Sequence, residues 1–428
     1  MENCKAVGGM HRECRTEATK PVGQRQNFIA TEMSYMTFKA LPSEALLSRL
    51  SFAFLRKRAT SITTEAADIK NEISAFRTLE NNPLNHNYSH VNQYYTLQKD
   101  VVHLYQHGGF PTPFQKQIKT FNEPCIMVRE STVELLDFLK RANYSQPAIR
   151  YVLYGETGCG KSLTLAHVLH FGFMNEFILV HVPLVERWTR YYKEVSNSTT
   201  RDGYVDLNVD AAAWLGHFKN QNAKLLQKLD LRISKKYEWS MREETEEGSP
   251  LIDVVDHGIK RIKYASECVI AVINEIKKHS TEGRCKTLVL IDGFNAFVHP
   301  TKCIVTEAKV KVAPSKVSLT EAFMEITKND WCNGAVVLTV DKVPVIVDKP
   351  KSYLPLYLLG KEGFEHLDPF VPVKISEYNE NEMESCLQYY INRRWLQNKR
   401  GHTEEGKKEL KYLSGMNPYH LMKICASL

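Results

Sequence analysis

The sequence lacks several features that would indicate particular classes of protein. No apolar run approaches the roughly 20 residues of a membrane-spanning helix, so no transmembrane helix is predicted. The ten cysteines are scattered and none forms a C-x-x-C pair, which argues against a zinc site of the usual spacing. A disulfide framework is also not expected from dispersed thiols in a chain of 428 residues. A reducing compartment fits this cysteine usage best.

The bulk composition is that of an ordinary globular protein, with 43% hydrophobic and 25% charged residues. The length is enough for two or three domains. The net charge of +7 and the isoelectric point of about 8.7 are a moderate basic excess. Such an excess is compatible with a nucleic-acid partner, but it fits a mildly basic protein without one equally well.

One segment of eight residues matches the phosphate-binding pattern G-x-x-x-x-G-K-[ST]. Its residues, together with the one that follows, are Gly155, Glu156, Thr157, Gly158, Cys159, Gly160, Lys161, Ser162 and Leu163. An apolar stretch at 149–154 precedes it and reads as a buried strand, and 163–171 reads as the start of a helix. In this context the backbone N–H groups of the turn and the helix dipole favour an anion. We therefore expect a P-loop in which Lys161 reaches the β- and γ-phosphates of a nucleotide.

The second half of the expected nucleotide site follows a later apolar strand. Asp292 ends the run 288–291 and, with the hydroxyl of Ser162, is the expected ligand pair for Mg²⁺. The residue after it is Gly293, where many hydrolysing P-loop enzymes carry a second acid. Asn295 could orient a water but is a poor base. We therefore expect tight binding with slow or absent hydrolysis. Thr339 either faces the γ-phosphate as a polar sensor or merely ends its strand.

Two further expectations concern the ligand and the loop thiol. The guanine-reading motif N-K-x-D is absent, because Asn398-Lys399-Arg400-Gly401 lacks the acid, so local motifs leave GTP, GDP and ATP open. Cys159 lies inside the phosphate loop at the start of a helix. The helix N-terminus should lower the pKa of this thiol, so that alkylation competes with nucleotide.

The N-terminal residues 1–64 are predicted to be an extension that contains a mitochondrial presequence. Residues 36–64 are basic, serine-containing and amphipathic with a single acid, Glu44, which is typical of such sequences. A surface helix of the folded protein is the alternative. Residues 1–35 do not share this character, so Met36, or Met33 just before it, is the expected working start.

The rest of the chain divides into three parts. Residues 65–125 are polar and rich in turn signals, and we predict an extended arm there rather than a domain. Residues 126–376 alternate strands and helices, which predicts an α/β domain with a doubly wound, mostly parallel sheet. Its strands are expected at 149–154, 177–182, 287–291, 335–340 and 371–375, and a helical insertion at about 190–286 includes the charged run 242–247. Residues 377–428 are predicted to be a small helical domain.

Several longer motifs resemble the death-associated protein three family, the GTP-binding proteins of the mitochondrial small ribosomal subunit. The resemblance runs from about residue 80 to the C-terminus. The segments that carry it are Tyr151–Ser162, Lys119–Glu123, Ile291–Ala296, Lys328–Trp331, Leu359–Phe364, Leu367–Phe370 and Thr403–Glu409.

This resemblance implies an AAA+/STAND-like P-loop domain with a helical lid, and GTP or GDP bound with Mg²⁺ mainly as a structural ligand. It implies a place in the mitoribosome of the matrix, against small-subunit rRNA and neighbouring proteins, with contact to the large subunit and a link to apoptosis. The residues that carry over are Gly155, Gly158, Gly160, Lys161, Ser162 and Asp292. The turn Gly415-Met-Asn-Pro418 resembles the lid turn that approaches the nucleotide, which adds Pro418.

Three functions compete. The first is a structural ribosomal protein that holds a nucleotide. The second is an active GTPase switch in mitochondrial translation or apoptosis signalling. The third is a ring-forming AAA+ ATPase, against which Gly293 argues.

Overall fold

The computed structural model describes residues 76–300, 304–306, 309–343 and 352–426. These residues belong to one compact unit, Thr64–Leu428. The expected presequence in 1–64 and the expected start at Met36 lie outside the described residues. Among the helices of the described part, none has the length and apolar character needed to cross a bilayer.

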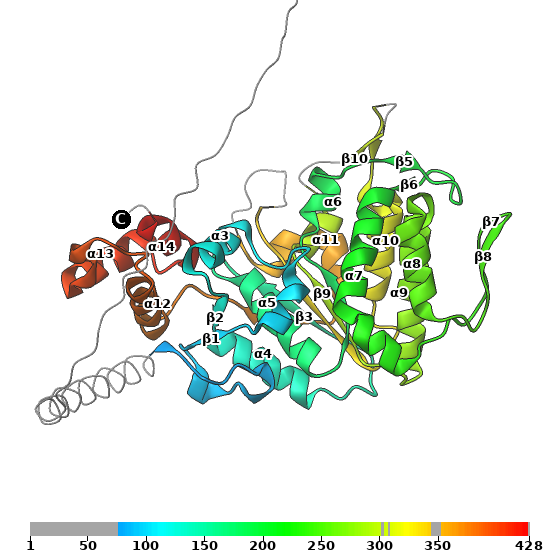
Figure 1. The fold of residues 1–428 in the computed structure, drawn as a ribbon. Coiled ribbons are helices and arrows are strands. Elements are labelled where there is room, and N and C mark those ends of the chain that lie inside the picture. The colour runs from blue at the N-terminus through cyan, green and yellow to red at the C-terminus, as the bar shows by residue number, and fades with distance from the viewer. Residues whose placement is uncertain (1–75, 301–303, 307–308, 344–351, 427–428) are drawn as a thin grey trace, which may run out of the picture. The chain divides into compact units, whose positions relative to one another are not determined.

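A five-stranded parallel sheet forms the centre of the molecule (Figure 1). Its strands are β3 (Ile149–Tyr154), β4 (Ile178–Val182), β9 (Thr287–Ile291), β12 (Gly334–Thr339) and β13 (Val371–Lys374). Their order across the sheet is β13-β3-β12-β9-β4, and every neighbouring pair is parallel. The predicted α/β class with a parallel sheet is confirmed, and the five strands lie within one residue of their expected bounds at each end.

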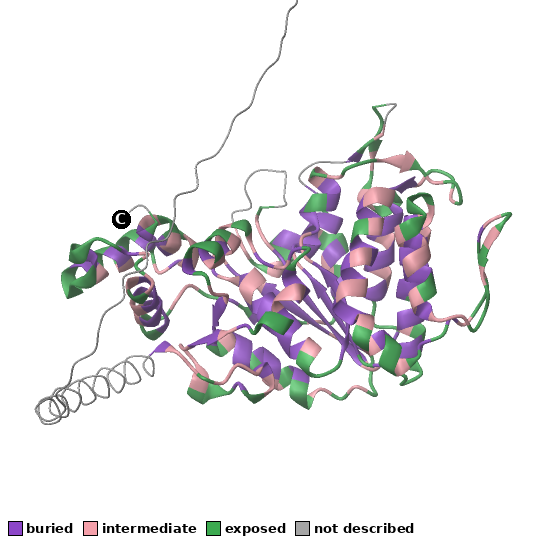
Figure 2. Ribbon diagram, viewed as in Figure 1, coloured by how far each residue is buried: buried purple, intermediate pink, exposed green. Residues whose placement is uncertain are grey.

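The strands β4, β9 and β12 are buried at every residue, and their sequences are almost entirely apolar (Figure 2). The edge strand β13 differs, because only Val373 of its four residues is buried. Alternate residues of β3 show the division: Val152 joins one core and Leu153 the other. The helices that contribute to the first core are α7 (Asn208–Leu229), α8 (Leu251–Lys260), α9 (Ala265–Thr281), α10 (Ser318–Ile326) and α11 (Pro355–Leu367). The second core includes α4 (Glu130–Arg141) and α5 (Lys161–Met174).

The segment before the sheet is not the extended arm that its polar composition suggests. Its strand β1 (Tyr94–Thr96) pairs antiparallel with β2 (Cys125–Met127), and the chain between these two strands contains α3 (Thr112–Phe121). Tyr95 and Leu104 are fully buried in the second core. The other elements of this segment are η1 (Pro83–Asn85), η2 (Tyr88–His90), α2 (Lys99–Val102) and η3 (His103–Tyr105). Such short elements contain too few apolar residues to show a periodicity that can be recognised in a sequence.

The insertion between β4 and β9 is mainly helical, as expected, but it also contains hairpins. The charged run 242–247 falls on the hairpin of β7 (Tyr237–Ser240) and β8 (Glu243–Thr245), which is set apart from the helices in Figure 1. The shorter elements of the insertion and of the following segment are α6 (Glu186–Arg190), β5 (Ser196–Asn197), β6 (Val205–Asp206), η4 (Ile262–Tyr264), η5 (Phe294–Phe297), β10 (Ile304–Val305), β11 (Lys311–Val312) and η6 (Pro314–Lys316).

The C-terminal part is helical, as the periodicity predicts. It consists of α12 (Glu380–Asn392), η7 (Lys399–His402), α13 (Glu404–Ser414) and α14 (Pro418–Cys425). These C-terminal helices share a third core with residues of the segment before the sheet. The residues of this core from that segment are Phe76, Tyr94, Phe121, Cys125 and Met127. The helices are too small to bury a core alone, and the earlier segment supplies the missing apolar surface.

Candidate nucleotide-binding site

A cavity of about 530 Å³ opens at the carboxyl end of the sheet. Ligands of open parallel sheets bind at this edge. The predicted site residues that line it are Thr157, Gly158, Cys159, Gly160, Lys161, Ser162, Leu163, Asp292 and Pro418. The segment 108–114, Arg187 and residues of the C-terminal helices line it as well. The fold therefore gathers most of the predicted residues around one space large enough for a nucleotide.

Three predicted residues lie behind the cavity lining. Gly155 has φ of 146° and packs so closely against the carbonyl of Ile375 that a Cβ would collide with it. Glu156 forms an ion pair of 2.8 Å with Lys342. The hydroxyl of Thr339 donates to Asp292 Oδ1 and accepts from the N–H of Gly293 at 2.8 Å. These residues shape the loop and orient the carboxylate.

The backbone of the loop presents free donors at the start of α5. The N–H groups of Thr157, Gly158 and Gly160 have no hydrogen-bond acceptor among the described residues. Lys161 is the first residue of α5, where N–H groups have no partner within the helix. Converging free N–H groups at a helix N-terminus are the arrangement that binds phosphate oxygens. The loop therefore fits the phosphate chain of a nucleotide.

Lys161 is 5% exposed, and its ammonium group is held in place by the loop itself. Its Nζ donates to the carbonyls of Gly155 and Glu156, both at 2.9 Å, and forms an ion pair of 2.8 Å with Asp341 Oδ2. The other oxygen of Asp341 accepts from the Thr157 hydroxyl at 2.6 Å. A phosphate that binds Lys161 would thus compete with the Asp341 carboxylate for the Lys161 ammonium group.

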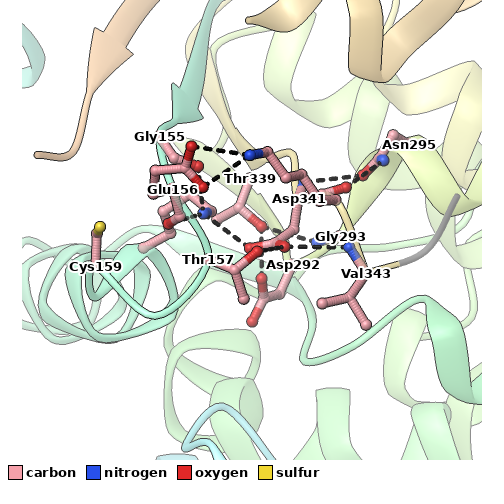
Figure 3. A network of polar contacts seen from close by, with 12 residues as sticks. Gly155, Glu156, Thr157, Cys159, Asp292, Gly293, Asn295, Thr339, Asp341 and Val343 are labelled. Carbon is pink, nitrogen blue, oxygen red and sulfur yellow. Dashed lines mark hydrogen bonds and ion pairs between the residues drawn. The ribbon is translucent and has the colours of Figure 1, made fainter. Parts of the chain in front are cut away.

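Asp292 and Ser162 lie side by side, as the prediction of a shared magnesium site requires. Ser162 lies close enough to the Asp292 carboxyl to act to lower its pKa. The Thr339 hydroxyl donates to Asp292 Oδ1 (Figure 3). Burial raises the pKa of Asp292, and the nearby Asp341 charge raises it further. A divalent cation at this point would favour the ionised carboxylate. One carboxylate oxygen and one hydroxyl, with waters and phosphate oxygens, make up the ligand set that Mg²⁺ prefers.

The polar groups next to Asp292 offer no free base for a water molecule. Gly293 carries no side chain, and Asn295 is fully buried. The Asn295 side-chain amide donates to the backbone carbonyl of Asp341 at 2.8 Å, and its oxygen accepts from the backbone N–H of Asp341 at 3.2 Å (Figure 3). Since one N–H and the oxygen of the amide are engaged, Asn295 holds the turn after β12.

The expectation of a reactive thiol at Cys159 is wrong. Its side chain is fully buried and lies away from the polar network (Figure 3). Its Sγ is 3.7 Å from Glu377 Oε1 and 3.7 Å from Asn417 Nδ2. Burial raises the pKa of Cys159 to about 12, and the Glu377 charge adds to this effect. Desolvation of the thiolate outweighs the helix dipole because the side chain points into the protein.

The C-terminal helices contact the loop through Arg129 and through the turn before α14. The Arg129 Nη1 donates to the carbonyl of Cys159 at 2.7 Å, and its Nε and Nη2 each bond the Glu382 carboxylate at 2.9 Å. The Asn417 amide donates to the carbonyl of Thr157 at 3.0 Å. The predicted turn at Pro418 therefore does approach the loop.

Sequence reasoning missed Asp341, Arg129 and Arg187. Asp341 is two residues beyond the end of its strand, and a polar residue after a strand is too common to be a signal. Arg129 is 253 residues from its partner Glu382, and nothing local marks that pair. Arg187 is an exposed residue of α6 that lines the cavity.

Comparison with known proteins identifies the family. The family described as mitochondrial ribosomal death-associated protein 3 matches residues 126–424. The small ribosomal subunit protein mS29 of Bos taurus is 42% identical over 353 residues, which cover 82% of this chain and 88% of that protein. The protein of the same name in Mus musculus is 38% identical over 378 residues, 88% of this chain and 95% of that protein. The chain therefore belongs to the mitochondrial ribosomal death-associated protein 3 family.

Proposed function

We propose that this chain is a structural constituent of the small subunit of the mitochondrial ribosome and acts in the mitochondrial matrix. The family match and the two mammalian relatives, both named as small ribosomal subunit proteins, support this role. Its partners are then the small-subunit rRNA and neighbouring ribosomal proteins. The basic excess of +7 suits contact with rRNA phosphates. Contact with the large subunit is part of the same proposal.

We further propose that the cavity holds GTP or GDP with Mg²⁺ in an AAA+/STAND-like P-loop fold. The observation that carries this proposal is the set of free N–H groups at Thr157, Gly158 and Gly160 beside the ammonium of Lys161. Ser162 and Asp292 would hold the metal. The ion supplies positive charge to the phosphates, while the loop positions them.

The bound nucleotide is mainly structural in this proposal, and turnover is slow or absent. Gly293 provides no acid after Asp292, and the Asn295 amide is engaged at both ends. A ligand at 100 times its Kd stabilises the protein that binds it by about 2.7 kcal/mol through mass action. The P-loop also contacts the C-terminal helices through Arg129 and Asn417, so its ordering would stabilise that contact.

The test compares the nucleotide content and the thermal stability of the purified wild-type chain with those of Lys161→Ala. Acid extraction of the wild-type protein should release guanine nucleotide in close to equimolar amount. Lys161→Ala should release almost none, and added GDP with Mg²⁺ should no longer raise its Tm. Lys361→Ala is the control, because that side chain is 86% exposed on α11. Equal nucleotide content in wild type and Lys161→Ala would contradict the proposal.

The alternative function is an active GTPase switch in mitochondrial translation or apoptosis signalling. Single-turnover hydrolysis on purified small subunits separates the two. The structural proposal expects a rate close to the solution background. A rate far above it that is lost in Lys161→Ala would favour the switch. Sedimentation in a sucrose gradient tests the ribosomal role, since the native protein should travel with the small mitochondrial subunit.

A further inference from the structure

A buried side-chain amide without a partner lines the cavity. Gln117 lies in α3 and is only 6% exposed. Among the described residues nothing donates to or accepts from its amide. Buried polar groups are almost always hydrogen-bonded, and leaving one unpaired is destabilising. A side chain that is mostly buried and whose unpaired amide lines a cavity is the arrangement expected of a ligand-binding group.

The helix that carries Gln117 presents it toward the C-terminal helices. Its buried residues Phe114, Gln117 and Phe121 are spaced along one face. Phe121 contacts the rings of Tyr390 and Trp395 with centroids 6.2 Å and 5.3 Å apart. This fixes α3 against the C-terminal helices.

The cavity around Gln117 is apolar and aromatic. Phe114 precedes Gln117 by one helical turn, and Met127 and Tyr390 line the cavity from β2 and α12. The loop with its free N–H groups lines the same cavity. One continuous space therefore offers donors for phosphates, apolar surface for a flat ring and a single free amide.

We propose that Gln117 hydrogen-bonds to the base of the bound nucleotide. This inference rests on the proposed function and adds the residue that contacts the base. A carboxamide presents a donor and an acceptor side by side, which matches the edge of a nucleobase. Phe114, Met127 and Tyr390 pack against the ring, and the P-loop holds the phosphates. The base-reading group thus comes from α3, outside the motifs that bind the phosphates.

The experiment compares ligands with and without a base. Titration calorimetry of the full chain measures the Kd of GDP and of ribose 5-diphosphate, each with Mg²⁺. Gln117→Leu should weaken GDP about tenfold, the loss of one hydrogen bond to a base, and leave ribose 5-diphosphate unchanged. Gln106→Leu is the matched control, because Gln106 is an exposed glutamine outside the cavity lining.

The outcomes separate this inference from the proposed function. An equal loss for both ligands, or no loss for GDP, overturns the role of Gln117 and leaves nucleotide binding intact. A wild-type chain that binds neither GDP nor ribose 5-diphosphate overturns both proposals.

A second variant tests base recognition through the ratio of the Kd values of ADP and GDP. A purely structural role of Gln117 would leave this ratio unchanged. Gln117→Glu keeps the acceptor and removes the donor. Guanine offers two adjacent N–H donors to a carboxylate, whereas adenine presents a ring-nitrogen acceptor beside its amino group. The Kd of ADP divided by the Kd of GDP should therefore rise about tenfold over its wild-type value. An unchanged ratio overturns the inference.

Discussion

Lys161 and Asp341 form an ion pair at the centre of the site, where phosphates are expected. The lysine side chain is 5% exposed and the aspartate side chain 21%. A buried ammonium group without a counter-charge is costly, so Asp341 stabilises the chain when no anion is present. In the proposed complex the same carboxylate would repel a phosphate and occupy the donor that the phosphate needs. Asp341 would thus have opposite effects on stability and on nucleotide binding.

Asp341→Asn should separate these two effects. The free energy of unfolding without ligand should fall by about 1–2 kcal/mol, less than for a fully buried pair because Asp341 is partly exposed. The affinity for GDP should rise about threefold to tenfold, because Lys161 no longer has to leave a carboxylate. Urea unfolding and titration calorimetry measure the two quantities.

The control for this prediction is Asp137→Asn, which removes an ion pair with Arg141, whose side chain is 79% exposed, and should change neither quantity by much. A weaker affinity for GDP in Asp341→Asn would contradict the prediction. It would instead indicate that Asp341 takes part in binding the metal or its waters.

The loop and α12 are joined by one guanidinium group. Arg129 lies just before α4, donates to the carbonyl of Cys159 in the loop and forms a two-bond ion pair with Glu382 in the first turn of α12. The side chains are 10% and 4% exposed. Glu382 also accepts from the N–H of Asn379 at 3.0 Å and so caps its own helix. Three elements therefore depend on one buried pair.

Removal of Glu382 should be far more damaging than removal of a neighbouring acid in the same helix. Glu382→Ala leaves Arg129 buried without a counter-charge and should lower the free energy of unfolding by about 3–5 kcal/mol. Glu384→Ala breaks a pair with Lys407 in which the Glu384 side chain is 33% exposed, and should cost about 1 kcal/mol or less. Denaturant unfolding measures both variants. An equal loss of unfolding free energy in the two variants would show that the buried Arg129–Glu382 pair stabilises the protein no more than the partly exposed pair.

Buried histidines are a property of the whole molecule, because they join segments far apart in the chain. His86 Nδ1 and His167 Nε2 are 2.9 Å apart, and His181 Nδ1 and His217 Nε2 are 3.0 Å apart. Burial lowers the pKa of all four, to about 3 for His217. Burial also lowers the pKa of His170 to about 4, with the charge of His86 acting in the same direction.

The sign of the pH dependence follows from these lowered pKa values. The unfolded chain binds protons at these histidines below about pH 6.5, while the folded chain binds them only at lower pH. The contribution of these histidines to the free energy of unfolding is therefore fully present above about pH 6.5. It is lost progressively as the pH falls toward 4. For His170 alone the loss between pH 7.5 and 5.5 is about 1 kcal/mol.

Urea unfolding at several pH values tests this prediction. His170→Gln should reduce the slope of stability against pH by about one proton, and His420→Gln, at an exposed position of α14, should leave the slope unchanged. A stability that stays constant from pH 7.5 to 5.5 in the wild-type chain would contradict the prediction.

The sequence by itself determined the features whose signal is contiguous. The strands β3 and β9 were predicted to the residue because runs buried on both faces are mostly apolar. The C-terminal helices followed from their apolar period. The loop 155–162 and Asp292 were predicted because each lies directly at the end of such a strand, and parallel strands bring their carboxyl ends to one edge.

Only the tertiary structure decided the surroundings of these residues. Cys159 was expected to be reactive from its place at a helix start, but its burial depends on Glu377 and Asn417, more than 200 residues away. Asp341 pairs with a lysine 180 positions earlier, and Gln117 reaches the cavity through packing between α3 and the C-terminal helices. A sequence pattern reports local backbone preference and burial, whereas desolvation and charge pairing depend on groups that only folding brings together.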